Sequence, residues 1–266
     1  MKKEKEPKVI YYKDELNDDF AGNDIKTCKV DNNFRYFNNS ILFRISSFLL
    51  RYLFAIPVLC LVNLLLFRPK IENKGILKQL KKKGYFVYAN HVLPFDPVVL
   101  PIKTNPSKTM LIVAGPDLFS INKFVSWLVR HFYAIPIPNM DATMIENFTE
   151  CISFHINKGH RVLLYPEAHI WPYYNDIRPF RSASFRYPVD NNAPIIVATT
   201  TFKKRKGNRK PKPVIYLDGP FYPNTDLSSI HDQVNDLRNR AYEAMKWRAG
   251  KEDNYAYIKY IKVDKK

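Results

Sequence analysis

Apolar residues divide the chain into three parts. Residues 1–38 are polar and rich in charge, residues 39–70 are dominated by one long apolar stretch, and residues 71–266 carry short apolar runs separated by polar ones. The first part, which has no hydrophobic period, predicts a mobile or loosely docked tail. The second part predicts a helical segment that anchors the chain in a membrane, and the third predicts an α/β domain.

The apolar stretch at 41–67 is interrupted only by Arg44, Arg51 and Asn63. Its uninterrupted part, 52–67, is shorter than the roughly 20 residues that a spanning helix needs. The whole stretch is long enough if the two arginine side chains reach towards lipid headgroups. The stretch therefore predicts a helix in contact with a membrane.

Pro57 is expected to kink this helix. Two membrane arrangements fit, a kinked spanning helix and a re-entrant or interfacial segment buried in one leaflet. A buried core helix of a soluble protein is the third interpretation, because apolar residues occupy every face. Basic residues flank both ends, so the positive-inside rule does not choose a side. We favour monotopic insertion with both ends, and the active site, on the cytoplasmic side of the membrane.

Short apolar runs that are typical of buried strands occur at residues 85–89, 110–114, 134–137, 161–165, 194–201 and 214–217. Helical patterns lie between them at 121–131 and 142–157, and an amphipathic helix is predicted at 226–248. Strands that alternate with helices predict an α/β fold, with a mostly parallel central sheet flanked by helices.

The formal net charge of +17, from 42 Lys and Arg against 25 Asp and Glu, calls for an anionic partner. Nucleic acid and the anionic headgroups of membrane lipids both fit this charge. The sequence has no helix-turn-helix, zinc-finger or aromatic-basic sheet signature, so we expect no nucleic-acid partner. The basic run at 203–212 lies between two predicted strands, as a solvated hairpin tip or as a contact with anionic headgroups.

The cysteines do not have the spacing of a zinc site or of a disulfide framework, and they fit a reducing compartment. They are Cys28, Cys60 and Cys151. Four histidines also lack ligand spacing and are interpreted as structural: His131, His155, His160 and His231. The sequence therefore predicts no metal site.

The first candidate for chemistry is a histidine just beyond the predicted strand at 85–89. His91 stands at the carboxyl end of that strand, where open α/β sheets place their ligands. Pro94 and Pro97 exclude a regular helix between His91 and Asp96, so a turn must bring the two together. A carboxylate there fixes the imidazole tautomer and leaves the other ring nitrogen free to take a proton from a hydroxyl. The pair predicts a general base without a protein nucleophile; the alternative is a helix-capping His with an Asp in a surface turn.

The second candidate follows the predicted strand at 161–165. Glu167 ends this run, and Arg178 and Arg181 lie downstream. A carboxylate at a second strand end, with arginines nearby, favours a polar or phosphorylated substrate. The alternative for Glu167 is a helix cap or an ion-pair partner.

Together these elements resemble the glycerolipid and lysophospholipid acyltransferase family, typified by 1-acylglycerol-3-phosphate acyltransferase. That family carries Asn-His-x4-Asp, then a Phe-Pro-Glu-Gly-Thr-Arg-like block, a Pro-Phe-Lys-x-Gly-like segment and an apolar Val-Pro-Ile-Ile-Pro-like strand. The matching residues here are Asn90-His91 with Asp96, then Tyr165-Pro166-Glu167, then 179–183 and 193–197. Order and spacing agree over residues 40–220, and several linked motifs are more specific than one.

The resemblance implies transfer of a fatty acyl group to a hydroxyl of a lysophospholipid or a related lipid. His91 would act as general base, Asp96 would orient it, and nearby N–H groups or a basic side chain would stabilise the oxyanion. The donor would be a thioester of coenzyme A or of acyl carrier protein, or an acyl phosphate, with no bound cofactor and no metal. Acyl carrier protein is thus a candidate partner besides membrane lipids. The substrate-binding residues would be Asn90, Glu167, Arg178 and Arg181.

Two departures from the family concern the acceptor's phosphate. The stretch 133–139 has no Arg where the family's second block ends in one, and Ala168-His169-Ile170 stands in place of Gly-Thr-Arg. Arg178, Arg181 or Lys123 are candidates to replace the missing arginines. Otherwise the acceptor is a glycolipid or glycan, or the chain is a non-catalytic lipid-binding membrane protein. A sugar ring would have three aromatic residues to stack on, Trp171, Tyr173 and Tyr174.

Overall fold

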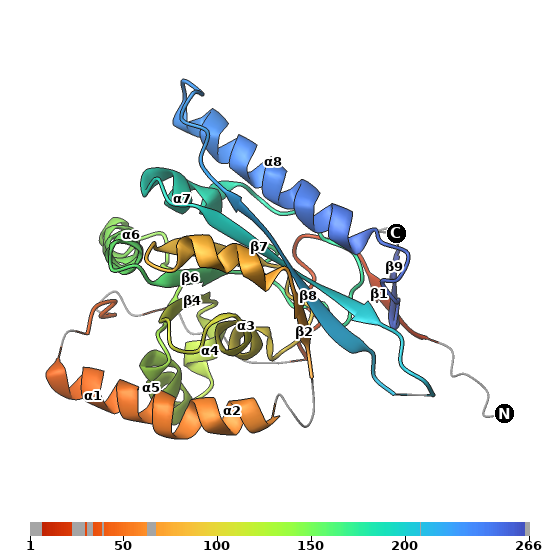
Figure 1. The fold of residues 1–266 in the computed structure, drawn as a ribbon, viewed down its shortest axis with the longest axis horizontal. Helices are drawn as coiled ribbons and strands as arrows, with labels where there is room; N and C mark the ends of the chain where they lie inside the picture. The colour runs from red at the N-terminus through yellow and green to blue at the C-terminus, as the bar shows by residue number, and fades with distance from the viewer. Residues whose placement is uncertain are drawn as a thin grey trace.

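The computed structural model describes residues 7–22, 30, 34–38, 40–62, 68–207 and 209–263, without the side chains of Leu59 and Val62. Its centre is a seven-stranded sheet with the strand order β2-β8-β7-β3-β6-β4-β5 (Figure 1). The strands are β2 (Lys70–Glu72), β3 (Tyr85–Ala89), β4 (Met110–Ala114), β5 (Ala134–Pro136), β6 (Arg161–Leu164), β7 (Ile195–Lys203) and β8 (Lys212–Phe221). Every neighbouring pair is parallel except β7 with β8, which form an antiparallel hairpin.

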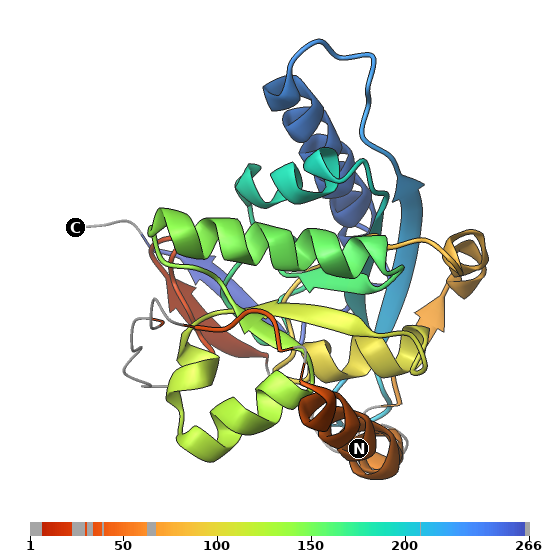
Figure 2. The ribbon, with the colours of Figure 1, turned by 90° about the vertical axis from the view of Figure 1, so that its left-hand side faces the viewer.

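Apolar side chains of the central strands alternate between the two faces of the sheet, as the pleat requires. Phe86 and Tyr88 pack on the face covered by α6 (Ala142–Asn157), the short helices η4 (Ala183–Phe185) and α7 (Arg186–Asp190), and α8 (Ile230–Ala249). Tyr85 and Val87 pack on the face covered by the 3₁₀ helix η3 (Lys74–Leu80) and by α3 (Asp96–Thr104). Figure 2 shows α6, α7 and α8 next to one another on one side of the sheet. The predicted sheet, mostly parallel and flanked by helices, is confirmed.

The predicted strands all occur with small boundary changes, as β3 to β8, and the predicted helices occur as α5 (Lys123–His131), α6 and α8. The last helix begins at Ile230 rather than at 226, because Ser229 is its N-cap and accepts a hydrogen bond from Asp232 N. The apolar stripe of α8 is buried, with Val234 and Met245 among its members. The basic run at 203–212 joins β7 to β8 as the predicted hairpin tip.

The first segment of the chain differs from the expectation of a loosely docked tail. β1 (Lys8–Tyr12) pairs in parallel with β9 (Ile258–Lys262), far apart in sequence and side by side in space (Figure 1). Residues 14–20 then run along the loop that follows β6. This strand pair was not predicted, because a lone five-residue alternation has no local partner. Residues 1–6, 23–29 and 31–33 of the predicted tail lie outside the described residues.

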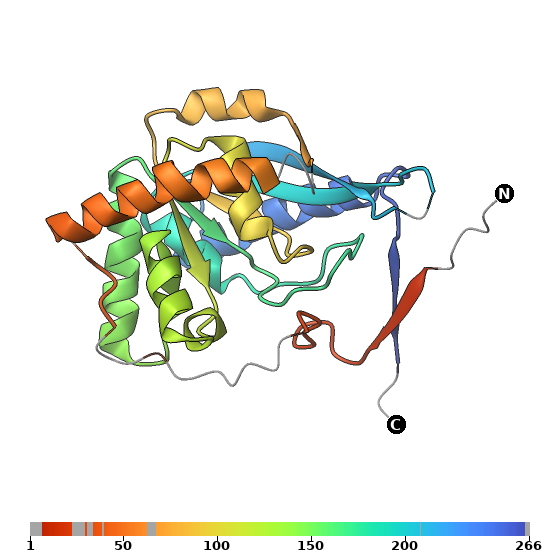
Figure 3. The ribbon, with the colours of Figure 1, turned by 90° about the horizontal axis from the view of Figure 1, so that it is seen from below.

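The predicted membrane segment is one continuous helix over its described part. It comprises α1 (Ile41–Leu49), a π-helical stretch η1 (Leu50–Ala55) and α2 (Ile56–Val62), and it passes along one side of the domain (Figure 3). The wider π-helical turns directly precede Pro57, which has no N–H to donate and whose ring needs room beside the preceding turn. Residues 63–67 of the predicted stretch lie outside the described part.

One face of this helix contacts the domain. Ser47 is buried, the ring of Phe43 lies 4.5 Å from that of His131 in α5, and the Tyr52 hydroxyl donates to Ser107 O at 3.1 Å. The other face carries exposed apolar side chains, including Leu42 and Phe54. By length and composition alone, Ile41–Val58 is long and apolar enough to cross a membrane.

Candidate active site

The candidate residues lie at the carboxyl ends of two neighbouring parallel strands. β3 and β6 pair with Tyr88 opposite Leu164, and the same register continued beyond the strands sets His91 beside Glu167. The His91 backbone N–H donates to Glu167 Oε2 at 3.1 Å, which confirms that the two strand ends meet. The two motifs found far apart in the sequence therefore form one site.

His91 and Asp96 face each other across the turn between β3 and α3. His91 Nδ1 lies 3.6 Å from Asp96 Oδ2, and both side chains are largely buried, with 12% and 3% exposed. The separation is longer than a hydrogen bond, and Nδ1 has no other partner among the described residues. Catalytic hydrogen bonds are often long before substrate binds, so this pair is arranged for an imidazole–carboxylate contact.

Asp96 also closes the turn that carries His91. Its Oδ2 accepts hydrogen bonds from Val92 N at 3.0 Å and from Leu93 N at 2.8 Å. Asp96 is the first residue of α3, where the helix dipole favours a negative charge, and Pro97 fits the first turn of that helix. The carboxylate thus shapes the turn and faces the imidazole with the same oxygen atom.

Glu167 is buried and joins two loops through hydrogen bonds. Its Oε2 accepts from His91 N, its Oε1 accepts from Arg178 N at 2.9 Å, and Arg178 Nη2 lies 3.8 Å from Oε2. Burial raises the pKa of Glu167, while the nearby Arg178 charge and the two N–H donors oppose this shift. Burial also lowers the pKa of Arg178. For both partners, desolvation outweighs the attraction between the two charges. We therefore infer that the pair fixes the positions of the two loops more than it stabilises the fold.

Arg178 is turned into the protein. It is fully buried, its Nη2 donates to the carbonyls of Glu167 and His169, and its guanidinium lies 4.9 Å from the Trp171 ring centroid. The predicted phosphate contact of Arg178 stays a prediction. In the structure its guanidinium supplies a donor for the inward-facing carbonyls of the loop after β6. Arg181 is exposed, and Lys123 lies exposed at the start of α5.

Asn90 is likewise turned into the protein, where its side chain bonds to Thr200. Its Nδ2 donates to Thr200 O at 3.0 Å, and its Oδ1 accepts from Thr200 N at 2.8 Å. The amide side chain continues the ladder between β3 and β7 by one step beyond the last backbone pair. Asn90 therefore fixes the direction in which the chain leaves β3, and with it the position of His91.

Tyr165 is a site residue to which the sequence assigned no role. Its ring stacks on the His91 imidazole, with centroids 4.2 Å apart and planes 23° apart. Its hydroxyl is buried without a hydrogen-bond partner among the described residues, and burial, with a smaller effect of Asp96, raises its pKa well above the usual value. The pairing of β3 with β6 could have predicted this contact, because the same register sets Tyr165 beside Ala89 at the end of β3.

Of the three aromatic residues that were candidates for sugar stacking, Trp171 is buried, and Tyr173 and Tyr174 are half-buried. Trp171 is completely buried, stacks on Tyr260 of β9 at 4.9 Å, and donates from its indole N–H to Asp18 O at 2.7 Å. Tyr173 packs against Phe202. The stacking hypothesis is therefore wrong for Trp171. Within the described residues, no group of His, Cys, Asp and Glu side chains is arranged to hold a metal ion.

Comparisons with known proteins give a family and a similar fold. A family model with the description Acyltransferase matches residues 68–200, half of the chain. A search of curated protein sequences finds no match. The fold is similar to the crystal structure of the 1-acyl-sn-glycerophosphate (LPA) acyltransferase PlsC from Thermotoga maritima, with a TM-score of 0.54 and 16% identity over 79% of this chain and 88% of that one.

Proposed function

The chain belongs to the acyltransferase family, and we propose that it moves a fatty acyl group from a thioester or acyl phosphate donor to a hydroxyl of a lysophospholipid or related lipid. The observation that carries this proposal is His91 facing Asp96 at the end of β3, beside Glu167 at the end of β6. The structural relative is an acyltransferase of 1-acyl-sn-glycerophosphate, which supports a lysophospholipid acceptor.

In the proposed reaction, Asp96 holds the Nδ1 side of the imidazole and the Nε2 side takes the proton of the acceptor hydroxyl. The hydroxyl oxygen forms a bond to the acyl carbon, and the carbonyl becomes an oxyanion. When the oxyanion collapses, the bond to the donor's sulfur or phosphate oxygen breaks, and the leaving group takes the proton back from His91. Coenzyme A, acyl carrier protein or phosphate leaves in this way, and no protein nucleophile or metal takes part.

The oxyanion needs donors other than the backbone of the motif itself. The amides of His91, Val92 and Leu93 are all occupied, the first by Glu167 and the other two by Asp96. We assign oxyanion stabilisation to donors that face the Nε2 side of His91 from other elements.

We place the enzyme at a membrane surface, with the helix at 41–62 lying in one leaflet and the active site on the cytoplasmic side. The placement is supported by the exposed apolar face of that helix and by its contacts with α5, which hold it against the domain. α5 adds further exposed apolar side chains, Phe124 and Trp127. Residues 71–266 would then form the catalytic domain and 39–70 the anchoring segment.

Replacement of His91 tests the chemistry. His91→Ala should lower acyl transfer by at least about 100-fold, the typical contribution of a positioned general base. His231→Ala is the matched control, because the side chain of His231 is 82% exposed and far along the chain from the motif. The measurement is transfer of a radiolabelled acyl group by purified enzyme, with circular dichroism to verify the fold. Near-normal transfer by His91→Ala would refute the mechanism, and an inactive unmutated protein would favour the lipid-binding alternative.

A non-phosphate acceptor is the second candidate, favoured by the burial of Arg178 and by the absence of an Arg from β5 and its flanks. A panel of lysophosphatidate, lysophosphatidylcholine, a monoacylglycerol and a glycolipid separates the two. If lysophosphatidate reacts fastest and Arg181→Gln lowers that preference, the acceptor carries a phosphate that Arg181 contacts. Preference for the glycolipid or monoacylglycerol, unaffected by Arg181→Gln, establishes the alternative.

A further inference from the structure

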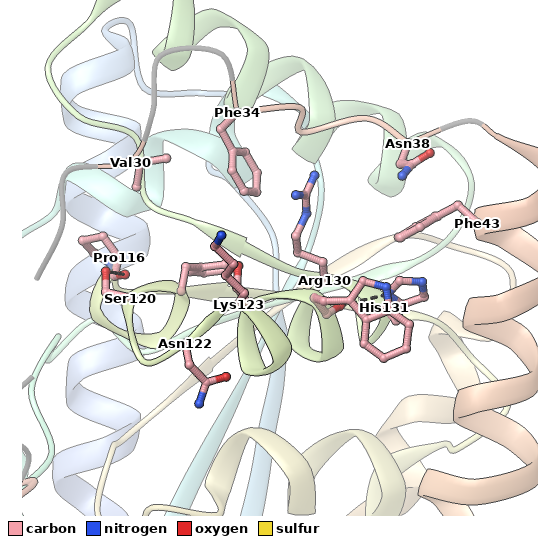
Figure 4. Close-up of a pocket in the computed structure, with 13 residues that line it drawn as sticks. Val30, Phe34, Asn38, Phe43, Pro116, Ser120, Asn122, Lys123, Arg130 and His131 are labelled. Carbon is pink, nitrogen blue, oxygen red and sulfur yellow. Dashed lines mark hydrogen bonds between the residues drawn. The ribbon is translucent and has the colours of Figure 1, made fainter.

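Two adjoining cavities lie between the segment 34–38, helix α1 and helix α5. Their volumes are about 730 Å³ and about 620 Å³, and Phe34, Asn38, Phe43 and Arg130 line both. Figure 4 shows Arg130 rising from α5 towards the segment 34–38, with Phe34 on one side and Phe43 on the other. The arginine therefore stands where the two cavities meet.

The first, which we call the apolar cavity, has aromatic rings in its wall, including Phe119 and Trp127, and the basic residues Lys123 and Arg130 also line it. The second, the basic cavity, is lined by Arg35, Arg44 and Lys158 in addition to Arg130. Its described lining contains no carboxylate. An elongated space with a basic end and an apolar end matches a molecule with an anionic headgroup and a hydrocarbon chain.

Among the described residues, no carboxylate forms an ion pair with the basic side chains named above for this cavity. Arg130 lies 4.7 Å from the Phe34 ring centroid, and burial together with Arg35 lowers its pKa. Like charges gathered without a counter-charge favour an anionic ligand.

The basic cavity lies at the opposite end of the sheet from His91. Its lining includes Thr109 and His160, which directly precede β4 and β6, whereas His91 and Glu167 follow β3 and β6. The four residues of β6 and the turn after it separate His160 from Glu167, and the strand alone spans roughly 13 Å. The cavity is therefore not part of the catalytic site.

The neighbourhood of the cavities identifies the source of the ligand. Arg44 belongs to α1, where Ile41, Leu42 and Ile45 are exposed on the same helix. The apolar cavity is likewise bordered by α5, whose Phe124 is 66% exposed. A ligand that entered between these two helices would come from the apolar phase that their exposed side chains contact.

We propose that the two cavities together bind one anionic phospholipid of the membrane. Its phosphate lies among Arg35, Arg44 and Arg130, with Lys158 at the far wall. One acyl chain occupies the apolar cavity between Phe43 and Trp127. The bound lipid acts as a structural ligand that joins helix α1 to α5, and it is not consumed at His91.

The test uses the purified full chain in nonionic detergent, with bound lipid counted by native mass spectrometry. Phosphatidylglycerol should be retained at one molecule per protein, at concentrations where phosphatidylcholine is not retained. The triple variant Arg35→Gln/Arg44→Gln/Lys158→Gln changes only exposed side chains and should weaken retention by about tenfold or more, because charge-assisted contacts are lost. Lys206→Gln/Arg209→Gln/Lys210→Gln at the hairpin tip removes the same charge and should retain the lipid.

Three outcomes would overturn the proposal: equal retention of both lipids, equal loss in both triple variants, or unchanged retention in the first. The proposal would also fail if sn-glycerol 3-phosphate or inorganic phosphate displaced the bound phosphatidylglycerol as effectively as added phosphatidylglycerol does. That result would assign the basic cavity to a free phosphate. His91→Ala should retain phosphatidylglycerol as the unmutated protein does. Loss of the lipid in that variant would place it in the catalytic site instead, whether or not the acyl transfer proposed above is correct.

Discussion

Two buried carboxylates organise the loop that carries His91. Glu167 holds its first amide and Asp96 holds the next two, so three successive N–H groups converge on acidic oxygens. The imidazole is further confined by the ring of Tyr165. These contacts fix the position of the proposed base.

Replacing Glu167 with Gln should lower the free energy of unfolding more than the loss of an exposed ion pair does. Gln offers one acceptor where His91 N and Arg178 N both donate, and it leaves the Arg178 guanidinium buried without a charged partner. We expect a loss of about 3 kcal/mol in the free energy of unfolding, in the range measured for broken buried pairs. Urea denaturation measures it. Asp190→Asn, which breaks an exposed pair with Arg186, is the control and should cost less than about 1 kcal/mol. Equal losses of unfolding free energy in the two variants would mean that the contacts of Glu167 do not stabilise the fold.

A buried histidine pair gives the fold a dependence on pH. His155 Nδ1 lies 2.9 Å from His160 Nδ1, and burial, with a smaller effect of His160, lowers the pKa of His155 to about 4. The folded pKa is below the ordinary value, so this group's contribution to stability is present above about pH 6.5 and is lost as the pH falls towards 4. At pH 5 the loss should be about 2 kcal/mol relative to neutral pH. His155→Gln should remove this part of the loss in urea unfolding at pH 7.5 and pH 5, while His231→Gln should not. An unchanged loss in His155→Gln would argue against the shift.

Residue roles were harder to predict than residue positions. The sequence predicted a turn that brings His91 to Asp96, and the two lie 3.6 Å apart. Glu167 joins them because the carboxyl ends of the parallel strands β3 and β6 meet at one edge of the sheet. Arg178 and Asn90 lie beside them but face inward, towards carbonyl groups that no sequence pattern reveals. Which way a polar side chain points depends on the backbone groups left unpaired around it, and these exist only after the loops have folded.

At the scale of elements, periodicity located the central strands and the long helices well. β3, β4 and α6 have the predicted bounds because their apolar patterns are complete within one element. β2, β1 and β9 were missed, since each is a short edge strand whose partner lies far away in the sequence. The helix at 41–62 was predicted, but its position against α5 and α3 follows from side chains on the other elements.

The exposed face of that helix should control membrane binding. Leu42→Glu/Leu53→Glu introduces two charges on exposed apolar positions and should reduce binding to phospholipid vesicles by at least about tenfold, because apolar burial in the interface is lost. Tyr222→Glu/Ile230→Glu makes the same change in charge at exposed positions around the start of α8 and should bind normally. Vesicle flotation measures both. Equal binding of all three proteins would exclude this face from the membrane contact.

At the scale of the whole molecule, the first and last strands brace the candidate site. Residues 18–20 bond to the loop of Glu167 through Asp18 O, Asp19 Oδ1 and the Phe20 amide. The Tyr260 hydroxyl of β9 donates to Pro172 O in the same loop. The catalytic end of the sheet is therefore held from outside by segments that lie outside the family match.

Deleting residues 1–22 should therefore impair the site without touching it. The deletion exposes Trp171, which should shift its fluorescence to longer wavelength, and transfer should fall by at least about tenfold because the Glu167 loop loses its support. Deleting only residues 1–6 leaves β1 whole and should change neither signal. Full activity after the longer deletion would show that the brace is dispensable.

The pairing of β1 with β9 also sets an order of events during synthesis. Lys8 can pair only after Ile258 has been synthesised. The pair of β1 and β9 therefore forms only after every other described element has left the ribosome. The apolar helix at 41–62 emerges far earlier and is available to lipid while the sheet is still incomplete. With the membrane placement proposed above, the nascent chain would reach the bilayer before the brace closes, so the candidate site would be completed only at the membrane surface.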